Sequence, residues 1–292
     1  MNYRHEGVSN GKRMALLCAG LVGLGILLLP GRSMAQTYTM SNGGSTATVN
    51  VGNSGVLGMN SWSVAGLPQS QLNQQWFWYS VNGAAPQPIN SISAASVFNF
   101  SQPASPLDDL GVQYNNQQLT VNVEYQLTGI NANSADLMEI LSIVNNSGSS
   151  INLSFYQYSN FNLLQNNNNT VSIGGSPGAY TGATQTAGGP GGNGIAEVID
   201  APLANYAEAA QVPQTLNELG TPAYLTLNDN TSASGNVSWA FQWNATVAAN
   251  GGTFNITKDK GLSVSLVPEP STLAFIALGA GALGLALRRK LA

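Results

Sequence analysis

The chain has 292 residues, and charged residues make up only 8% of it, against about 25% in an ordinary soluble domain. Seven of its nine basic residues lie in the first 32 or the last five positions, so that only Lys258 and Lys260 lie between residues 36 and 267. Eleven carboxylates accompany these two lysines, which gives this region a net charge of −9. So few cations cannot neutralise phosphates, and we therefore expect no nucleic acid partner and no binding to anionic lipid surfaces.

The same region has neither cysteine nor histidine, because His5 and Cys18 both precede it. Disulfide bonds, the usual Ser-His-Asp and Cys-His nucleophile arrangements and an ordinary zinc site are therefore excluded from it. Carboxylates remain as catalytic groups. The enzymes that use them are chiefly glycosidases, which need two acids facing each other across a cleft.

The first 35 residues have the organisation of a signal peptide. A basic stretch ending at Arg13 precedes an apolar run over residues 14–29, which a proline and a glycine then break. Small residues at positions 33 and 35 fit the cleft of signal peptidase, so we expect that enzyme to cut between Ala35 and Gln36. The alternative is a retained N-terminal anchor.

The last 26 residues, 267–292, contain three features in a fixed order. They are the residues Pro268, Glu269 and Pro270, an uncharged run over 271–287, and the residues Arg288, Arg289 and Lys290. As a helix the uncharged run spans roughly 25 Å, close to the hydrocarbon thickness of about 30 Å. The cations that follow hold its end on the cytoplasmic side. We therefore predict a single C-terminal transmembrane helix in the inner membrane, with the bulk of the chain outside.

This tripartite tail closely resembles the PEP-CTERM sorting signal of Gram-negative bacteria. In that family an exosortase, a membrane-embedded enzyme similar to cysteine transpeptidases, recognises the tail and removes it. The resemblance implies that Pro268, Glu269 and Pro270 are the recognition residues, that 271–287 is a transient anchor, and that Arg288 to Lys290 form the membrane stop. The alternative is a plain C-terminal anchor. The resemblance covers the tail only and brings no family for the region before it.

Residues 36–266 read as one exported domain rich in β-strands. Side chains alternate between apolar and polar over Leu119–Leu127 and Val237–Ala245, which is the pattern of half-buried strands. Further strand candidates are Thr46–Val51, Gln75–Val81, Leu137–Val144, Ile151–Tyr158, Tyr224–Leu227 and Leu262–Leu266. We predict an all-β fold, an antiparallel β-sandwich, with residues 145–150 as a hairpin loop and one or two short helices within 202–220.

Three acids of this domain are candidates for chemistry. Glu139 shares the apolar face of its strand with Leu137 and Leu141. If buried it has a raised pKa suited to general acid catalysis, but the favoured interpretation is an edge strand whose inward charge blocks aggregation. Glu197 and Asp200 flank two apolar residues and form a weaker candidate for a catalytic pair. Glu124 lies on a polar face, where we expect it to be solvated.

Two other groups of residues have alternative interpretations. Asp108, Asp109 and Asp229 lie in turn-like sequence, where carboxylates can hold Ca²⁺, although ordinary turn and capping roles are favoured and no cofactor is expected. The aromatic stretches 76–79 and 239–243 can stack on sugar rings, but their spacing favours core packing.

These features lead to two functional hypotheses. The first is a non-enzymatic structural or interaction protein, cut by signal peptidase and an exosortase-like enzyme and placed at the cell surface or in the extracellular matrix. The second is a carbohydrate-binding module or a carboxylate glycosidase that acts on extracellular polysaccharide. Two carboxylates facing each other in a cleft lined by exposed aromatic residues favour the second hypothesis.

Overall fold

The computed structural model describes residues 36–187 and 194–264. The predicted signal peptide 1–35, with Ala35 of its cleavage site, lies outside the described residues. So do the sorting motif Pro268–Pro270, the predicted transmembrane helix and the cations 288–290. Among the described residues there is no helix with the length and hydropathy needed to cross a membrane.

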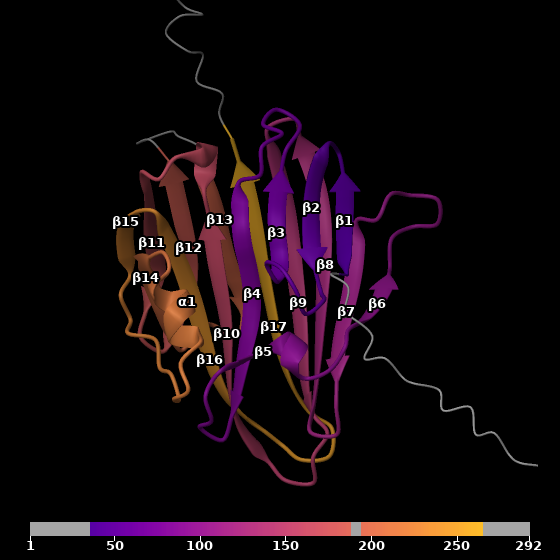
Figure 1. Ribbon diagram of the computed structural model, residues 1–292, viewed down its shortest axis with the longest axis vertical. Helices are drawn as coiled ribbons and strands as arrows, with labels where there is room; N and C mark the ends of the chain where they lie inside the picture. The colour runs from indigo at the N-terminus through magenta and orange to yellow at the C-terminus, as the bar shows by residue number, and fades with distance from the viewer. Residues whose placement is uncertain (1–35, 188–193, 265–292) are drawn as a thin grey trace, which may run out of the picture. The chain divides into compact units, whose positions relative to one another are not determined.

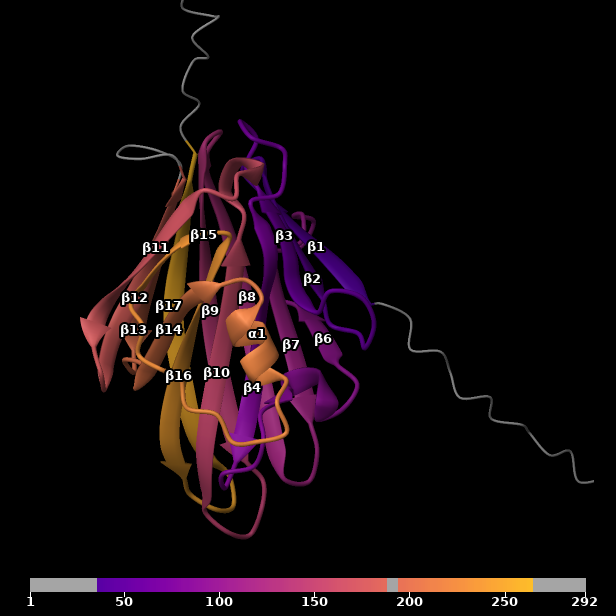
Figure 2. The same ribbon diagram turned by 60° about the vertical axis from the view of Figure 1, so that its left-hand side comes forward.

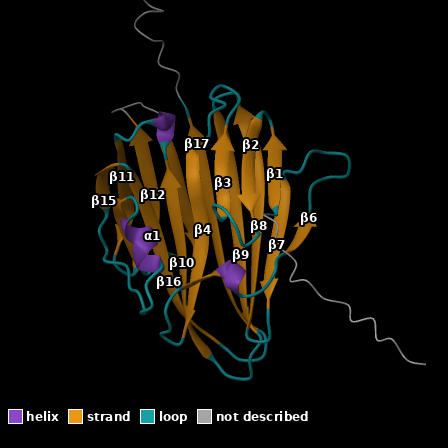
Figure 3. Ribbon diagram, in the orientation of Figure 1, coloured by secondary structure: helices purple, strands orange, loops and turns teal. Residues whose placement is uncertain are grey.

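Almost all regular structure is β-strand, as the secondary-structure colouring in Figure 3 shows. An eight-stranded antiparallel sheet has the order β1-β2-β3-β4-β10-β16-β14, and the short β5 also pairs with β4. Its strands are β1 Thr37–Asn42, β2 Ser45–Asn50, β3 Gly58–Ser63, β4 Leu72–Val81, β5 Gln87–Pro88, β10 Ile151–Phe161, β14 Tyr206–Gln211 and β16 Val237–Val247.

A nine-stranded antiparallel sheet has the order β15-β11-β12-β13-β17-β9-β8-β7-β6. Its strands are β6 Ser96–Asn99, β7 Asp109–Asn115, β8 Leu119–Asn131, β9 Ser134–Asn145, β11 Asn169–Ser176, β12 Ala179–Ala187, β13 Gly194–Ala201, β15 Ser232–Gly235 and β17 Gly252–Ser263. The helices of the described residues are one α-helix, α1 Gln214–Leu219, and two 3₁₀ turns, η1 Ile89–Ser91 and η2 Leu163–Gln165.

The two sheets lie face to face and enclose the core, which confirms the predicted antiparallel sandwich (Figures 1 and 2). Alternation along the strands decides which side chains face inward. Every second residue of β8 from Leu119 to Leu127 is at most 2% exposed, and the residues between them are half-buried on the outer face. In β4 and β16 both faces are buried over 76–78 and 237–243.

The connection between β9 and β10 is a crossover, so the predicted hairpin loop is wrong. β9 belongs to the nine-stranded sheet and β10 to the eight-stranded sheet. The side chain of Asn145 holds this crossover, because its Nδ2 donates to the carbonyl oxygens of Ser149 at 2.8 Å and Val247 at 3.1 Å, and its Oδ1 accepts from Ser147 N at 3.0 Å. A polar loop after a strand does not reveal which sheet the next strand joins.

The segment 221–231 covers part of the outer face of the eight-stranded sheet, over β10 and β16. The predicted strand Tyr224–Leu227 is wrong, because this segment pairs with no strand. It attaches to side chains instead, since Tyr156 donates its hydroxyl to Leu225 O at 2.7 Å and Gln242 Oε1 accepts from Leu227 N at 3.0 Å. In the region 202–220 one predicted helix is present as α1, whereas 206–211 forms strand β14.

Candidate functional site

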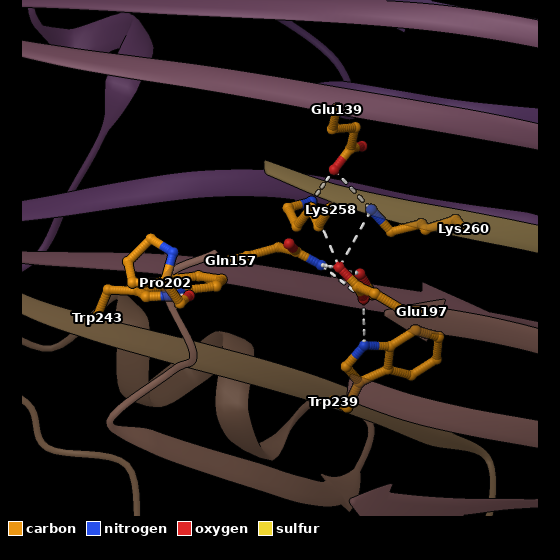
Figure 4. Close-up of polar contacts among 9 residues, drawn as sticks. Glu139, Gln157, Glu197, Pro202, Trp239, Trp243, Lys258 and Lys260 are labelled. Atoms are coloured by element: carbon orange, nitrogen blue, oxygen red, sulfur yellow. Dashed lines mark hydrogen bonds and ion pairs between the residues drawn. The ribbon is translucent and has the colours of Figure 1, made fainter. Parts of the chain in front are cut away.

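The core contains a cluster of four charged side chains, all from the nine-stranded sheet (Figure 4). Strand pairing places Lys258 of β17 opposite Glu139 of β9, and Lys260 of β17 opposite Glu197 of β13. None of the four side chains has any solvent-exposed surface. We call these four residues the buried ion cluster.

The charges of the buried ion cluster alternate in sign around a closed ring. Nζ of Lys258 contacts Oε2 of Glu139, and Nζ of Lys260 lies 2.6 Å from the same oxygen. Each of the two lysine Nζ atoms also lies 3.3 Å from Oε1 of Glu197. Every lysine thus has two carboxylate neighbours, and every carboxylate has two lysine neighbours.

Side chains of the eight-stranded sheet complete the surroundings of the cluster. Gln157 Nε2 donates to both carboxylate oxygens of Glu197, at 2.7 and 2.9 Å, and Trp239 Nε1 donates to Oε2 at 2.7 Å. The ring of Phe77 lies 5.2 Å from Nζ of Lys258, within cation–π range. The two sheets are therefore joined at Glu197 by hydrogen bonds as well as by apolar packing.

Burial dominates the electrostatics of both lysines. It lowers the pKa of Lys258 well below the ordinary value of 10.5, and the neighbouring charge of Lys260 lowers it further. Burial also lowers the pKa of Lys260, although Glu197 opposes the shift. Removing an ion from water costs several kcal/mol, which only close pairing and hydrogen bonding offset. Loss of one member of the ring therefore leaves an uncompensated charge in the core.

The structure changes the interpretation of Glu139. Its side chain is buried on the apolar face of β9, but β9 lies between β17 and β8 in the centre of its sheet. The edge-strand interpretation is therefore wrong, and two lysines neutralise the inward charge. A general acid must reach its substrate, whereas this carboxylate is enclosed between the sheets.

The other candidate acids of the sequence do not come together. Glu197 points into the core, whereas Asp200 is exposed and interacts with Asp259 on the outer face. The proposed pair of Glu197 and Asp200 is therefore not formed. Glu124 lies on the outer face of β8 as expected, but it is half-buried and accepts a hydrogen bond from Gln126 at 2.6 Å.

The three acids considered as calcium ligands make different contacts. Asp108 accepts a hydrogen bond from Asn42 Nδ2 at 2.8 Å, and Asp229 accepts one from Ala207 N at 3.3 Å. Burial raises the pKa of Asp109, and the charges of Glu124 and Asp108 raise it further. The described part of the chain contains no group of three or more acidic, histidine or cysteine side chains that could hold a metal ion.

The tryptophan-rich stretches pack in the core, as their spacing predicted. Trp76, Trp239 and Trp243 are each at most 1% exposed. Trp239 stacks on Phe161 with ring centroids 5.4 Å apart, in addition to its bond to Glu197. None of these three indole rings is available to stack on a sugar.

A groove on the outer face of the nine-stranded sheet was not anticipated. Phe98 and Phe100 of β6 and the segment after it are 43% and 53% exposed, and their rings are parallel within 3° at 6.1 Å. They flank a groove of about 400 Å³ whose floor includes Gly111, Asn122 and Glu124. Gly111 makes room for the ring of Phe100, because a Cβ there would lie 2.4 Å from it.

Comparison with known families concerns the tail of the chain. Residues 266–290 match the model of the PEP-CTERM protein-sorting motif. The chain carries a PEP-CTERM sorting motif. The motif implies an exported protein that an exosortase-like enzyme processes at the membrane, in agreement with the resemblance of the tail. The match begins at residue 266, so it assigns no family to the β-sandwich.

Solved structures share the fold of the sandwich that precedes this motif. A bacterial glucoamylase complexed with acarbose has a TM-score of 0.51 at 10% identity, over 86% of this chain and 36% of the glucoamylase chain. A putative aldose 1-epimerase from Escherichia coli K12 has a TM-score of 0.50 at 10% identity, over 79% of this chain and 99% of the epimerase. The chain thus spans about a third of the glucoamylase. At 10% sequence identity, this similarity shows only that the proteins share a fold. No curated protein sequence matches the chain.

Proposed function

We propose that residues 36–266 form a non-enzymatic interaction domain, which the PEP-CTERM motif delivers to the cell surface or the extracellular matrix. The observation that supports a non-enzymatic role is the enclosure of the buried ion cluster. Its two glutamates, Glu139 and Glu197, are candidate catalytic acids from the sequence, but both are neutralised by lysines and their side chains have no exposed surface. A glycosidase needs its two acids in an open cleft on either side of the scissile bond.

The sorting motif provides the test of delivery. Glu269→Ala in the full chain removes the central acid of the motif, and we expect this variant to accumulate in the inner-membrane fraction with its tail uncut. The unchanged protein is expected in the surface or medium fraction. Asp200→Ala, which removes an exposed acid from the sandwich, serves as the matched control and is expected to be processed normally. Release of the Glu269 variant with the same tail cleavage would contradict the proposal.

A carbohydrate-binding role is the second candidate, and the groove beside Phe98 and Phe100 favours it. Flat aromatic faces beside amide and carboxylate groups match a sugar ring, which has apolar faces and hydroxyl edges. Asn122 and Glu124 supply such polar groups in the floor of the groove. The two similar folds described above belong to proteins named for sugars, which is consistent with this candidate.

Binding of the protein to polysaccharide from its own host's matrix tests this second role. We expect a Phe98→Ala, Phe100→Ala double variant to bind about tenfold more weakly, since loss of two aromatic contacts amounts to about 1.4 kcal/mol or more. Ile130→Ala, which removes another exposed apolar side chain, is the control. Equal binding by both variants would exclude the groove as the sugar site.

A further inference from the structure

We propose that Lys258 and Glu139 become joined by an intramolecular amide bond between Nζ of the lysine and Cδ of the glutamate. The bond would link strand β17 covalently to strand β9. This inference concerns a covalent modification inside the sandwich and does not depend on the function proposed above.

The strand register brings the two reacting groups together. Lys258 and Glu139 are direct partners across the β9–β17 pair, so their side chains leave the sheet side by side on the same face. The contact between Nζ of Lys258 and the Glu139 carboxylate is the closest of the four ion pairs in the cluster. Neither side chain is exposed, and the ring of Phe77 lies beside the amine. Water, which would compete for both groups, is kept away from them.

Charge burial favours the bonded form. The cluster holds two cations and two anions in an apolar core, where each ion is costly to desolvate. Amide formation removes one charge of each sign and replaces them with a neutral group, which is cheaper to bury. Oε1 of Glu139 accepts no hydrogen bond from the described residues. Glu197 and Lys260 remain as a pair, and Glu197 keeps the hydrogen bonds from Gln157 and Trp239.

The remaining members of the cluster supply the groups that such a condensation needs. Proton transfer within the pair gives a neutral amine and a carboxylic acid, and burial, which lowers the pKa of Lys258, favours the neutral amine. Nζ then attacks Cδ. Lys260, 2.6 Å from Oε2 of Glu139, stabilises the negative charge that develops on the carboxyl oxygens.

Glu197 is placed to carry the proton. Its Oε1 lies 3.3 Å from Nζ of Lys258, where it can take a proton from the attacking nitrogen and return it to the departing oxygen of Glu139. The Nζ–Cδ bond forms, one Cδ–O bond breaks, and one water molecule leaves. Nothing is oxidised or reduced, so no further reactant is required.

The position of the bond suits a domain that cannot form disulfides. Residues 36–266 contain no cysteine, and the bond would connect positions 119 residues apart in the sequence. In the chain-entropy model, a cross-link stabilises the folded state by lowering the conformational entropy of the unfolded chain, and the effect grows with the length of the closed loop. Both strands lie inside the nine-stranded sheet, with β9 next to β17.

Mass spectrometry tests the bond directly. The full chain is expressed in a host that processes it, and the mature protein is purified and its termini are mapped. We expect its mass to be lower than the sequence mass by one water molecule. Between residues 36 and 264 trypsin has only two sites, Lys258 and Lys260. The bonded lysine resists trypsin after denaturation, and a chymotryptic digest should contain a branched peptide that includes both Glu139 and Lys258.

Two arginine variants form a matched pair. Lys258→Arg keeps the charge but cannot form the amide, so its mature form should have the full sequence mass. Lys260→Arg keeps the proposed nucleophile and should still lose one water. Wild-type protein of full mass that trypsin cuts after Lys258 would overturn the proposal, and this readout needs no variant to fold. A branched peptide through Lys260 would overturn the assignment of the nucleophile.

Discussion

At the scale of single residues, Glu197 connects more groups than any other side chain of the cluster. It lies 3.3 Å from both lysine Nζ atoms and accepts hydrogen bonds from Gln157 and Trp239, which belong to the opposite sheet. All these partners are buried. Because buried donors without partners and unpaired buried charges are both costly, this carboxylate is the residue at which the core is most sensitive to substitution.

We predict that Glu197→Ala lowers the free energy of unfolding by about 3–5 kcal/mol, the loss expected when one partner of a buried ion pair is removed. Urea denaturation followed by tryptophan fluorescence measures the change. Glu124→Ala, at a half-buried position on the outer face, is the control and should change stability by about 1 kcal/mol or less. Equal effects of the two substitutions would mean that the ring contributes nothing particular to stability.

Asp136 and Asp259 give a prediction of pH dependence on the outer face of the sheet. Burial raises the pKa of Asp136 above 3.8, and the charge of Asp259 raises it further. A carboxyl group whose pKa is raised by folding contributes stability at pH values below its pKa in the unfolded chain. This contribution is lost as the pH rises through its pKa in the folded protein. We therefore expect Asp136→Asn to raise the free energy of unfolding at pH 7 by about 0.5 kcal/mol, with the gain vanishing below a pH of about 4.

A double-mutant cycle checks the cause of that shift. Burial and the charge of Asp200 raise the pKa of Asp259. If Asp136 and Asp259 repel each other, either single substitution to Asn removes the whole repulsion. The gains in the free energy of unfolding from Asp136→Asn and Asp259→Asn at pH 7 should therefore sum to more than the gain of the double variant. Strictly additive gains at neutral pH would contradict the coupling.

The sequence revealed part of the buried ion cluster. The periodicity of β9 placed Glu139 among inward apolar residues, as observed. The same rule applied to β17 would have placed Lys258 and Lys260 on the face of Leu262 and Val264, which is buried. The lysines were missed because long cations normally lie in solvent. The sequence did contain a signal for them. Lys258 and Lys260 are the only cations between residues 36 and 267, a region that has eleven acids.

At the scale of elements, close approach between segments depends on glycine. Gly129 of β8 lies against the β1–β2 turn, where an added Cβ would be 2.2 Å from Asn42 O. Gly261 of β17 has open space where its Cβ would be. Both glycines are in strands of the nine-stranded sheet and neither has a positive φ. Substitution of each glycine by alanine therefore compares a crowded position with an open one.

We predict that Gly129→Ala destabilises the domain by about 1–3 kcal/mol, because the turn must move away. Gly261→Ala should instead stabilise it by about 0.4–1 kcal/mol, because alanine restricts the unfolded chain without a clash. Thermal unfolding of the two variants gives the signs. A stabilising Gly129→Ala would show that the β1–β2 turn does not pack on β8 as described.

Strand prediction succeeded where one face of the strand is apolar. β8 and β16 begin within a residue of the predicted ranges, since alternation marked them. The alanine-rich segment Tyr206–Gln211 lies within 202–220, where the sequence predicts one or two short helices, but it forms strand β14 because pairing with β16 overrides helix propensity. Tyr224–Leu227 has the alternation of a strand, yet it binds sheet side chains instead of strand backbone. Sequence periodicity does not identify the pairing partner.

At the scale of the whole chain, an exported sandwich without cysteine is followed by a sorting motif. The described domain combines two large sheets, an ion cluster that joins them and a covering segment, 221–231, on the outer face of one of them. Residues 266–290 match the PEP-CTERM motif. Because function resides in sites and not in the fold, a sugar-binding role of this domain is tested at the groove beside Phe98 and Phe100.

The most direct test of the account is to map both termini of the protein recovered from the cell surface and the medium by mass spectrometry. We predict an N-terminus at Gln36 and a C-terminus near the segment Pro268–Pro270, with longer forms confined to the inner membrane. A chain found folded in the cytoplasm, with leader and tail both intact, would contradict the account.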